Sequence, residues 1–275
     1  MSTSRNISYR AAFIMAGLML AYLGLDAQVE WRKVENRAFK AGERIQLGFY
    51  YDAWLTGKII AGIGITEVKE TDRTFNGREV YHLDAKGFSK GLFHFFYKVN
   101  DKFDSYIDKE FLAPHYFVRQ TREGGYQKFD EYDFNQEDEY VITRTDSMHV
   151  PRYTQDFISV VYFARTFDDD TLEAGDKFYV DFFIDDSLYH AAVFFEGREV
   201  VKIKLGTFNC LRLKPMMAVG EVFTETYPMT LWVTDDDNHV PVLAKSAVFI
   251  GNIKMELMEY SGLANEPTSV IELRE

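Results

Sequence analysis

Short segments in which hydrophobic and polar residues alternate recur along most of the chain. Examples are "REVYHLDAKGF", "DKFYVDFFID" and "NIKMELMEYSG", and turns rich in Gly, Asn and Asp separate such segments. A period of two residues, with many β-branched and aromatic side chains, is typical of strands that bury one face. The pattern therefore predicts a mostly β protein built from antiparallel sheets.

One stretch at the midpoint, "YTQDFISVVYFARTF" (residues 153–167), departs from this pattern. Thr154 suits the start of a helix, and apolar residues such as Phe157, Val161 and Phe163 extend around most of the cylinder. A helix with so narrow a polar face should be largely buried. We therefore expect one central buried α-helix within residues 151–168.

The two halves of the chain share an order of turn residues. Asp108 precedes Pro114 by the same interval that separates Asp235 from Pro241, and a glycine follows each proline. Asp bonds to the backbone in turns, and Pro fits the first position of a strand. The order suggests an internal duplication, although hairpins that all use Asp, Pro and Gly can match by coincidence.

These patterns predict two similar curved antiparallel β-sheet units of an open-barrel type, joined by the central helix. The polar end of the chain is expected to be a flexible tail. The predicted segments are a signal peptide (1–27), a first β unit (38–150), a connecting helix (151–168), a second β unit (172–263) and a tail (264–275).

The N-terminal segment has the features of a secretory signal. Arg5 and Arg10 precede the apolar run 11–25, and Ala27 stands at a suitable cleavage point. The run is shorter than the ~20 residues of a membrane span, and no Cys follows it to carry a lipid. We expect an exported protein of the periplasm or outer membrane that does not span a membrane after cleavage; an uncleaved anchor is the alternative.

Charge narrows the set of partners. The formal net charge is −12, so the chain repels phosphate backbones, and no nucleic acid partner is expected. Anionic membrane surfaces are disfavoured for the same reason.

The sequence shows no motif for covalent catalysis. GxSxG and SxxK patterns are absent, and the only cysteine, Cys210, lies in the apolar strand pattern "FNCLRLKP", which indicates a buried thiol. "TDDDNH" places Asp235, Asp237 and Asn238 in one loop, but the order of an EF-hand is missing, so a solvated turn is favoured over a calcium site. We therefore predict no catalytic residue, no metal and no cofactor.

Aromatic residues make up 16% of the chain and suggest an apolar binding surface. In "GLFHFFYKV" (91–99), strand alternation would place Phe93 and Phe95 on one face. Together with Phe157, Val161 and Phe163, they are our candidates for residues that line a ligand cleft. The alternative is that the same five side chains only fill a core.

Three longer segments resemble a known family: "FYKVNDKFDSYIDKEFLAPHYFVRQTREGGY", "VPRYTQDFISVVYFAR" and "LWVTDDDNHVPVL". They are similar to exported bacterial proteins of the DUF3108 type, and the likeness covers most of residues 38–263. The resemblance implies export and brings no reaction. A weaker likeness to the periplasmic lipoprotein-carrier (LolA-like) architecture implies a curved antiparallel sheet whose concave side is covered by helices over an apolar cavity.

The combined hypothesis is a non-enzymatic protein of the cell envelope that binds an apolar ligand, such as a lipid or acyl chain, or a partner segment, in a cleft of the curved sheet. The alternative is a structural module that contacts an envelope protein or a glycan without a ligand cavity. A glycan hydrolase that uses a pair of carboxylates is the least favoured reading, because sequence alone does not pair the many acidic residues.

Overall fold

The computed structural model describes residues 30–53, 57–169, 171–216, 229–247 and 252–274. The chain divides into two compact units, Met1–Arg32 and Lys33–Glu275, and all the elements below belong to the second. The predicted signal peptide, residues 1–27, lies outside the described residues. Within the described ranges, no helix combines the length and the hydropathy that a membrane crossing requires.

The first half of the unit contains short helices as well as strands. Its elements are β1 (Arg44–Ala53), β2 (Gly57–Lys69), β3 (Thr74–Phe75), β4 (Arg78–Ser89), α2 (Phe93–Phe96), β5 (Asn100–Asp108), β6 (Pro114–Glu123), β7 (Tyr126–Asn135), β8 (Tyr140–Ile142), β9 (Ser147–His149) and α3 (Ser159–Ala164). The elements of the second half are β10 (Lys177–Ile184), β11 (Ser187–Lys202), β12 (Gly206–Pro215), β13 (Met229–Thr234), β14 (Pro241–Ala247), β15 (Asn252–Ser261) and β16 (Val270–Leu273).

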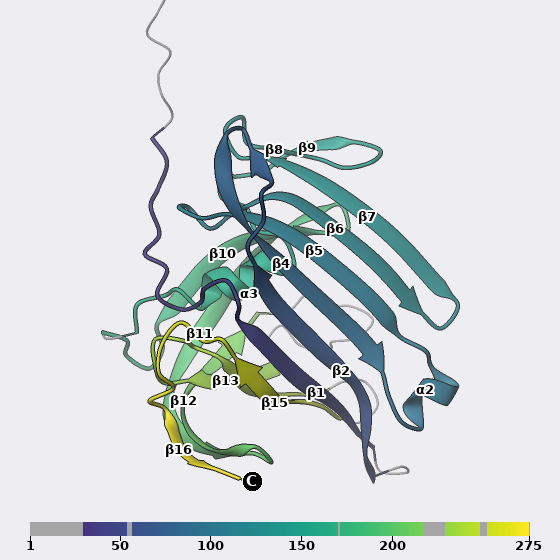
Figure 1. Cartoon of the computed structure of the whole chain (residues 1–275), viewed down its shortest axis with the longest axis vertical. Helices are drawn as coiled ribbons and strands as arrows, with labels where there is room; N and C mark the ends of the chain where they lie inside the picture. Colours follow the sequence, from purple (N-terminus) through teal and green to yellow (C-terminus); the bar gives the residue numbers. More distant parts are fainter. Residues whose placement is uncertain (1–29, 54–56, 170, 217–228, 248–251, 275) are drawn as a thin grey trace, which may run out of the picture. The chain divides into compact units, whose positions relative to one another are not determined.

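All these strands belong to one antiparallel system, which confirms the mostly β prediction (Figure 1). The order along the main sheet is β10-β11-β12-β13-β14-β15-β1-β2-β4-β5-β6-β7-β8-β9, with β16 beside β12 and β3 beside β4. The two halves meet where β15 pairs with β1, with Tyr260 opposite Ile45. The hydrogen-bonded sheet therefore runs without a break from one half into the other, and a duplication of two similar units stays a prediction.

The sheet is open, because β10 and β9, the strands at its ends, do not pair with each other in the described residues. It curves enough for β10 to approach the far half. Gln155 bridges the free edge of β10, with its N–H 2.8 Å from the Asp181 carbonyl and its carbonyl 2.8 Å from the Phe183 N–H. Asp185, in the turn after β10, bonds to Arg119 of β6 and Lys128 of β7.

One face of the sheet, here called the inner face, carries the core of the first half. Leu83 of β4, Phe117 of β6 and Tyr132 of β7 are almost completely buried and pack with Phe183 of β10 and with α3. Direct cross-strand partners point to the same face, so the alternation that marks these strands in the sequence places their apolar residues together. This is the surface on which α3 lies.

The opposite face of the same strands is polar. Lys69 of β2 pairs with Asp84 of β4 at 2.5 Å, and Asp104 of β5 pairs with both His82 and Lys102. Polar contacts at a partly exposed surface contribute little stability each, but they show that this face of the strands carries the polar side chains.

The central helix is shorter than the sequence predicts. Instead of spanning 151–168, α3 has six residues, Ser159–Ala164. The preceding residues have other roles, because Gln155 completes the edge of β10 and Asp156 accepts hydrogen bonds from the N–H groups of Ile158 and Ser159 at 2.7 and 2.8 Å. A carboxylate in that position caps a helix, so α3 begins after it.

The end of the chain also differs from its prediction. The flexible tail expected from residue 264 onward contains β16, which pairs with the start of β12. Ser269 is buried, and its N–H bonds to the Asp236 carboxylate. By contrast, the predicted strand starts are confirmed, since Pro114 begins β6 and Pro241 begins β14.

Candidate functional site

The open side of α3 is the first candidate site. Ile158 and Tyr162 point into the core and are buried, whereas Phe157 and Val161 on the other side are 44% and 48% exposed. The ring of Phe157 lies 5.6 Å from that of Phe103 on β5. We call the exposed apolar surface formed by Phe103, Phe157 and Val161 the α3 surface. Half-exposed aromatic and aliphatic side chains on an otherwise packed helix are available to an apolar ligand.

A buried carboxyl group holds the start of this surface. Asp156 is inaccessible to solvent and accepts a hydrogen bond from the Ser105 hydroxyl of β5, in addition to its two bonds to the start of α3. Burial raises the pKa of Asp156 to about 6, although these hydrogen bonds act in the opposite direction. Because β5 and α3 share this one side chain, the position of Phe157 relative to Phe103 is fixed by polar contacts.

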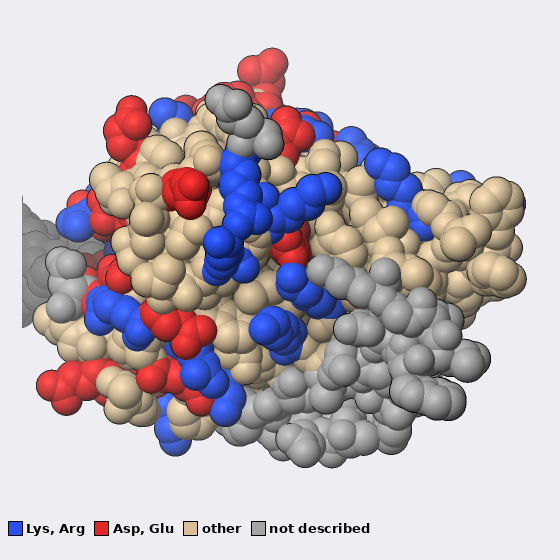
Figure 2. All heavy atoms as spheres, turned by 90° about the horizontal axis from the view of Figure 1, so that it is seen from below, with Lys and Arg blue, Asp and Glu red and all other residues tan. Residues whose placement is uncertain are grey.

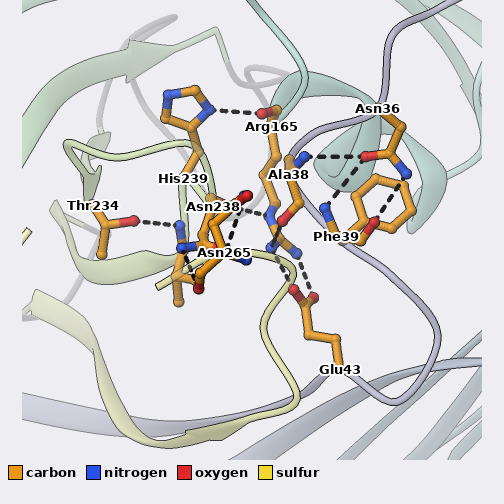
Figure 3. Close-up of polar contacts among 10 residues, drawn as sticks. Asn36, Ala38, Phe39, Glu43, Arg165, Thr234, Asn238, His239 and Asn265 are labelled. Atoms are coloured by element: carbon orange, nitrogen blue, oxygen red, sulfur yellow. Dashed lines mark hydrogen bonds and ion pairs between the residues drawn. The ribbon is translucent and has the colours of Figure 1, made fainter. Parts of the chain in front are cut away.

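A second polar group fixes the other end of α3 (Figure 3). Arg165 is 4% exposed, and its Nη1 and Nη2 atoms lie 2.6 and 2.7 Å from the two carboxylate oxygens of Glu43. Its Nε atom donates to the carbonyl of Asn238, and Nη2 also donates to the carbonyl of Ala38, both at 3.1 Å. Four of the five N–H donors of the guanidinium are therefore paired with acceptors.

The surroundings of Arg165 keep it charged. Burial by itself would lower the pKa of this guanidinium, but the charge and hydrogen bonds of Glu43 raise it above its ordinary value. The rings of Tyr162 and Phe39 lie 5.1 and 5.7 Å from its central carbon. Removing one member of such a pair leaves an uncompensated charge in the core.

The contacts around Arg165 bring four distant parts of the chain together. Asn238, in the turn between β13 and β14, exchanges hydrogen bonds with Asn265 near the end of the chain. Asn265 in turn donates to the carbonyl of Arg37, and Asn36 accepts bonds from the N–H groups of Ala38 and Phe39. The group therefore acts as a tether for the N-terminal segment, α3, the β13–β14 turn and the tail.

A polar cavity of about 170 Å³ lies beside this tether, lined by Glu35, Arg37, Ala38, Arg165, Thr166, Phe167, Asp168, Asp169, Asp237 and His239. His239 is buried, and its Nδ1 atom donates to the Arg165 carbonyl at 2.7 Å. This bond assigns the proton to Nδ1, while Nε2 lies 3.4 Å from an oxygen of Asp169. The cavity is acidic and polar, so it does not suit an acyl chain.

The described residues offer little for metal or covalent chemistry. In those ranges, no group of three or more His, Cys, Asp and Glu side chains is arranged to hold a metal. Cys210 is fully buried in β12, as predicted, and burial, followed by nearby carboxylates such as Asp235, raises the pKa of its thiol to about 12. A thiol with that pKa is not a nucleophile at neutral pH.

Comparison with known families identifies the chain. Residues 39–258 match the model of a family described as "Protein of unknown function (DUF3108)". The chain belongs to the DUF3108 family. This confirms the family that its motifs resemble, and no curated protein matches the chain.

Solved structures share the fold of this DUF3108 chain at low identity. A β-barrel-like protein of the DUF1849 type from Brucella abortus has a TM-score of 0.54 and 9% identity, over 80% of this chain and 97% of that chain. Two further matches, each 12% identical, are a protein from Bacteroides fragilis described as exported with a YmcC-like fold (TM-score 0.35, 82% of this chain and 97% of that chain) and a protein from Parabacteroides distasonis described as a lipoprotein (TM-score 0.33, 84% and 100%). The open antiparallel sheet with α3 against its inner face is consistent with the LolA-like architecture.

The five residues predicted to line a cleft fall into two groups. Phe157, Val161 and Phe163 lie on or beside α3, with Phe163 partly buried against the core. Phe93 and Phe95 lie in α2, and the strand predicted for residues 91–99 is wrong, because a one-turn helix occupies its middle. Phe95 is 81% exposed there, so it lines neither a core nor the α3 surface.

Sequence reasoning missed the tether in the DUF3108 chain. Arg165 is visible in the sequence as one of few polar residues in an apolar stretch, but its partner Glu43 is distant along the chain. The turn "TDDDNH" was interpreted as solvated, yet Asn238 and His239 are buried. A charged residue inside an apolar segment was the available signal, because it needs a buried partner.

Proposed function

We propose that this DUF3108 protein is an exported, non-enzymatic protein of the cell envelope that binds an apolar ligand on the α3 surface. The ligand is a lipid, an acyl chain or an apolar segment of a partner. The observation that carries the proposal is the half exposure of Phe157 and Val161 beside Phe103, on a helix whose two ends are held by Asp156 and Arg165.

Rigid support is what makes these exposed side chains useful for binding. A surface held open before the ligand arrives does not lose conformational entropy when the ligand binds. Each side chain that is covered contributes about 25 cal/mol per Å² of buried apolar area. The buried thiol and the buried, ion-paired Arg165 agree with a binding role, because both groups are held in the interior.

A titration with dansyl-undecanoic acid, a fluorescent fatty acid, tests the proposal. We expect saturable binding, and the double variant Phe157→Ser/Val161→Ser should weaken it by about tenfold or more, because it removes two apolar contacts. The matched control is Val200→Ser on β11, where the side chain is also well exposed (61%) but far along the chain from α3. Equal affinity in the double variant and the control, or no saturable binding, would overturn the proposal.

The polar cavity supports a second candidate function, a docking module for another envelope protein. Asp168, Asp169 and Asp237 line it together with Glu35, which suits a basic partner segment. Under this reading, Asp168→Asn/Asp237→Asn would abolish recovery of a stoichiometric partner from envelope extracts and leave fatty-acid binding unchanged. Recovery of the same partner by both forms would exclude it.

A further inference from the structure

The helix α2 leaves most of its apolar side chains exposed to solvent. Leu92, Phe95 and Phe96 are 69%, 81% and 87% exposed, and no residue of α2 is buried. Positions i, i+3 and i+4 lie on one side of a helical turn, so these three side chains form one apolar face. A helix that serves a core has the opposite polarity.

Hydrogen bonds at the base of α2 keep this face outward. The Ser89 hydroxyl lies 2.9 Å from both His94 Nδ1 and the N–H of Val99, which closes the loop behind the helix. The Ser89 N–H also bonds to the Val99 carbonyl, and the Gly124 N–H bonds to the Lys98 carbonyl. The loop is therefore held in place by β4 and the turn after β6 instead of collapsing onto its own aromatic rings.

The charge around α2 is opposite to that of the whole chain. Residues 89–99 contain Lys90 and Lys98, both exposed, and no acidic residue, whereas the net charge of the chain is −12. Two acidic residues lie next to this segment: Glu123, which accepts a hydrogen bond from the Tyr97 hydroxyl, and Asp101. Figure 2 shows that the end at the right, where α2 lies in Figure 1, is covered by uncharged side chains with Lys or Arg side chains beside it.

We propose that α2 is a lipid-docking tip, formed by Leu92, Phe95 and Phe96, that inserts into the surface of a phospholipid bilayer. Rings and aliphatic chains enter the boundary between headgroups and acyl chains, while ammonium groups next to them meet lipid phosphates. At physiological ionic strength, charges farther away than about 8 Å are largely screened, so the electrostatic contribution comes from Lys90 and Lys98 together with the neighbouring Glu123. The tip is distinct from the α3 surface, because the two share no residue: the tip consists of Leu92, Phe95 and Phe96, and the α3 surface consists of Phe103, Phe157 and Val161.

A bilayer fits this geometry better than a protein partner does. All three side chains project from a single turn, and two of them are more than four-fifths exposed. The interior of a bilayer would surround these projecting side chains on all sides. A protein partner would need a pocket of matching shape to cover them. The lysines at both ends of the segment suit a plane of phosphates.

A site-specific label tests the tip in the full chain. Cys210 is the only cysteine and is fully buried, so Phe96→Cys can be labelled selectively with a nitrobenzoxadiazole fluorophore. We expect a blue shift and a rise in emission when vesicles of phosphatidylcholine and phosphatidylglycerol (3:1) are added. The matched control is Tyr179→Cys on β10, where the side chain is 75% exposed, and its emission should not change.

Two further variants separate the contributions. Leu92→Ser/Phe95→Ser in the labelled Phe96→Cys protein should reduce the vesicle response by about tenfold. Lys90→Gln/Lys98→Gln should weaken the response to the mixed vesicles but not to pure phosphatidylcholine. An unchanged emission at position 96, or equal responses at 96 and 179, would overturn the proposal and point to a protein partner, and fatty-acid binding at the α3 surface would be unaffected by either result.

Discussion

Two aromatic segments of similar hydrophobicity differ in their burial in this protein. Residues 153–167 and residues 91–99 each contain one short helix, α3 and α2. The first packs Ile158 and Tyr162 into the core, whereas the second buries no residue of its helix. Hydrophobic content therefore does not explain why one is inside and the other outside.

The difference lies in the polar residues that flank each helix. α3 is preceded by the buried Asp156 and followed by the buried Arg165; Asp156 bonds to Ser105 of β5, and Arg165 bonds to Glu43 just before β1. The polar contacts of the α2 loop lie at the surface: His94, which bonds to Ser89 of β4, is exposed, and so is Lys98, whose carbonyl accepts a bond from Gly124 in the turn after β6. Buried polar anchors therefore accompany the segment that packs into the core, whereas the polar contacts of the other segment are exposed.

The largest expected effect is at the tether. Arg165→Met should lower the free energy of unfolding by about 3–5 kcal/mol, because Glu43 is left buried without a counter-ion. Urea denaturation measures the change. The double variant Arg165→Met/Glu43→Leu should recover most of the loss, and if it is as unstable as the single variant, the ion pair is not the anchor.

The cap of α3 predicts a dependence on pH. The pKa of Asp156 is about 6 in the folded protein, above its ordinary value of 3.8, so the folded state holds the proton more tightly. Its contribution to stability is complete below pH 4 and is lost as the pH rises through 6, by up to about 3 kcal/mol. Urea denaturation from pH 4 to 7 should show this fall for the natural chain and a flatter profile for Asp156→Asn; parallel profiles would contradict it.

The open side of α3 should matter little to stability. Phe157→Ser/Val161→Ser is expected to lower the free energy of unfolding by about 1 kcal/mol, since both side chains are already half exposed. Thermal unfolding followed by circular dichroism checks this value. A loss comparable to that of Arg165→Met would show that these residues belong to the core and would remove the α3 surface as a binding site.

The smallest effect is expected at α2. Leu92→Ser/Phe95→Ser/Phe96→Ser should change the free energy of unfolding by no more than about 0.5 kcal/mol, because the three side chains have no buried contacts to lose. The same urea titration measures it. A marked destabilisation would show that the α2 side chains also pack in the fold, and it would contradict the difference between the two helices.

Local pattern predicted the parts of this fold that depend on neighbouring residues. Alternation predicted a strand in "REVYHLDAKGF", where Leu83 and His82 lie on opposite faces of β4, and proline marked the starts of β6 and β14. The same logic failed at Phe93–Phe96, because an apolar run of that length suits a buried strand and an exposed helical turn equally well. Whether this run becomes a buried strand or an exposed helical turn depends on whether other parts of the molecule pack over its apolar side chains.

By itself, the sequence determined the antiparallel β class, the burial of Cys210 and the family. The tertiary structure alone decided that β15 joins β1 in one sheet, that Glu43 meets Arg165, and that α2 faces outward while α3 faces inward. Periodicity reports only the environment along one strand or turn. Pairing between residues far apart in the chain depends on loop closure and on buried charges finding their partners, and no local pattern encodes that choice.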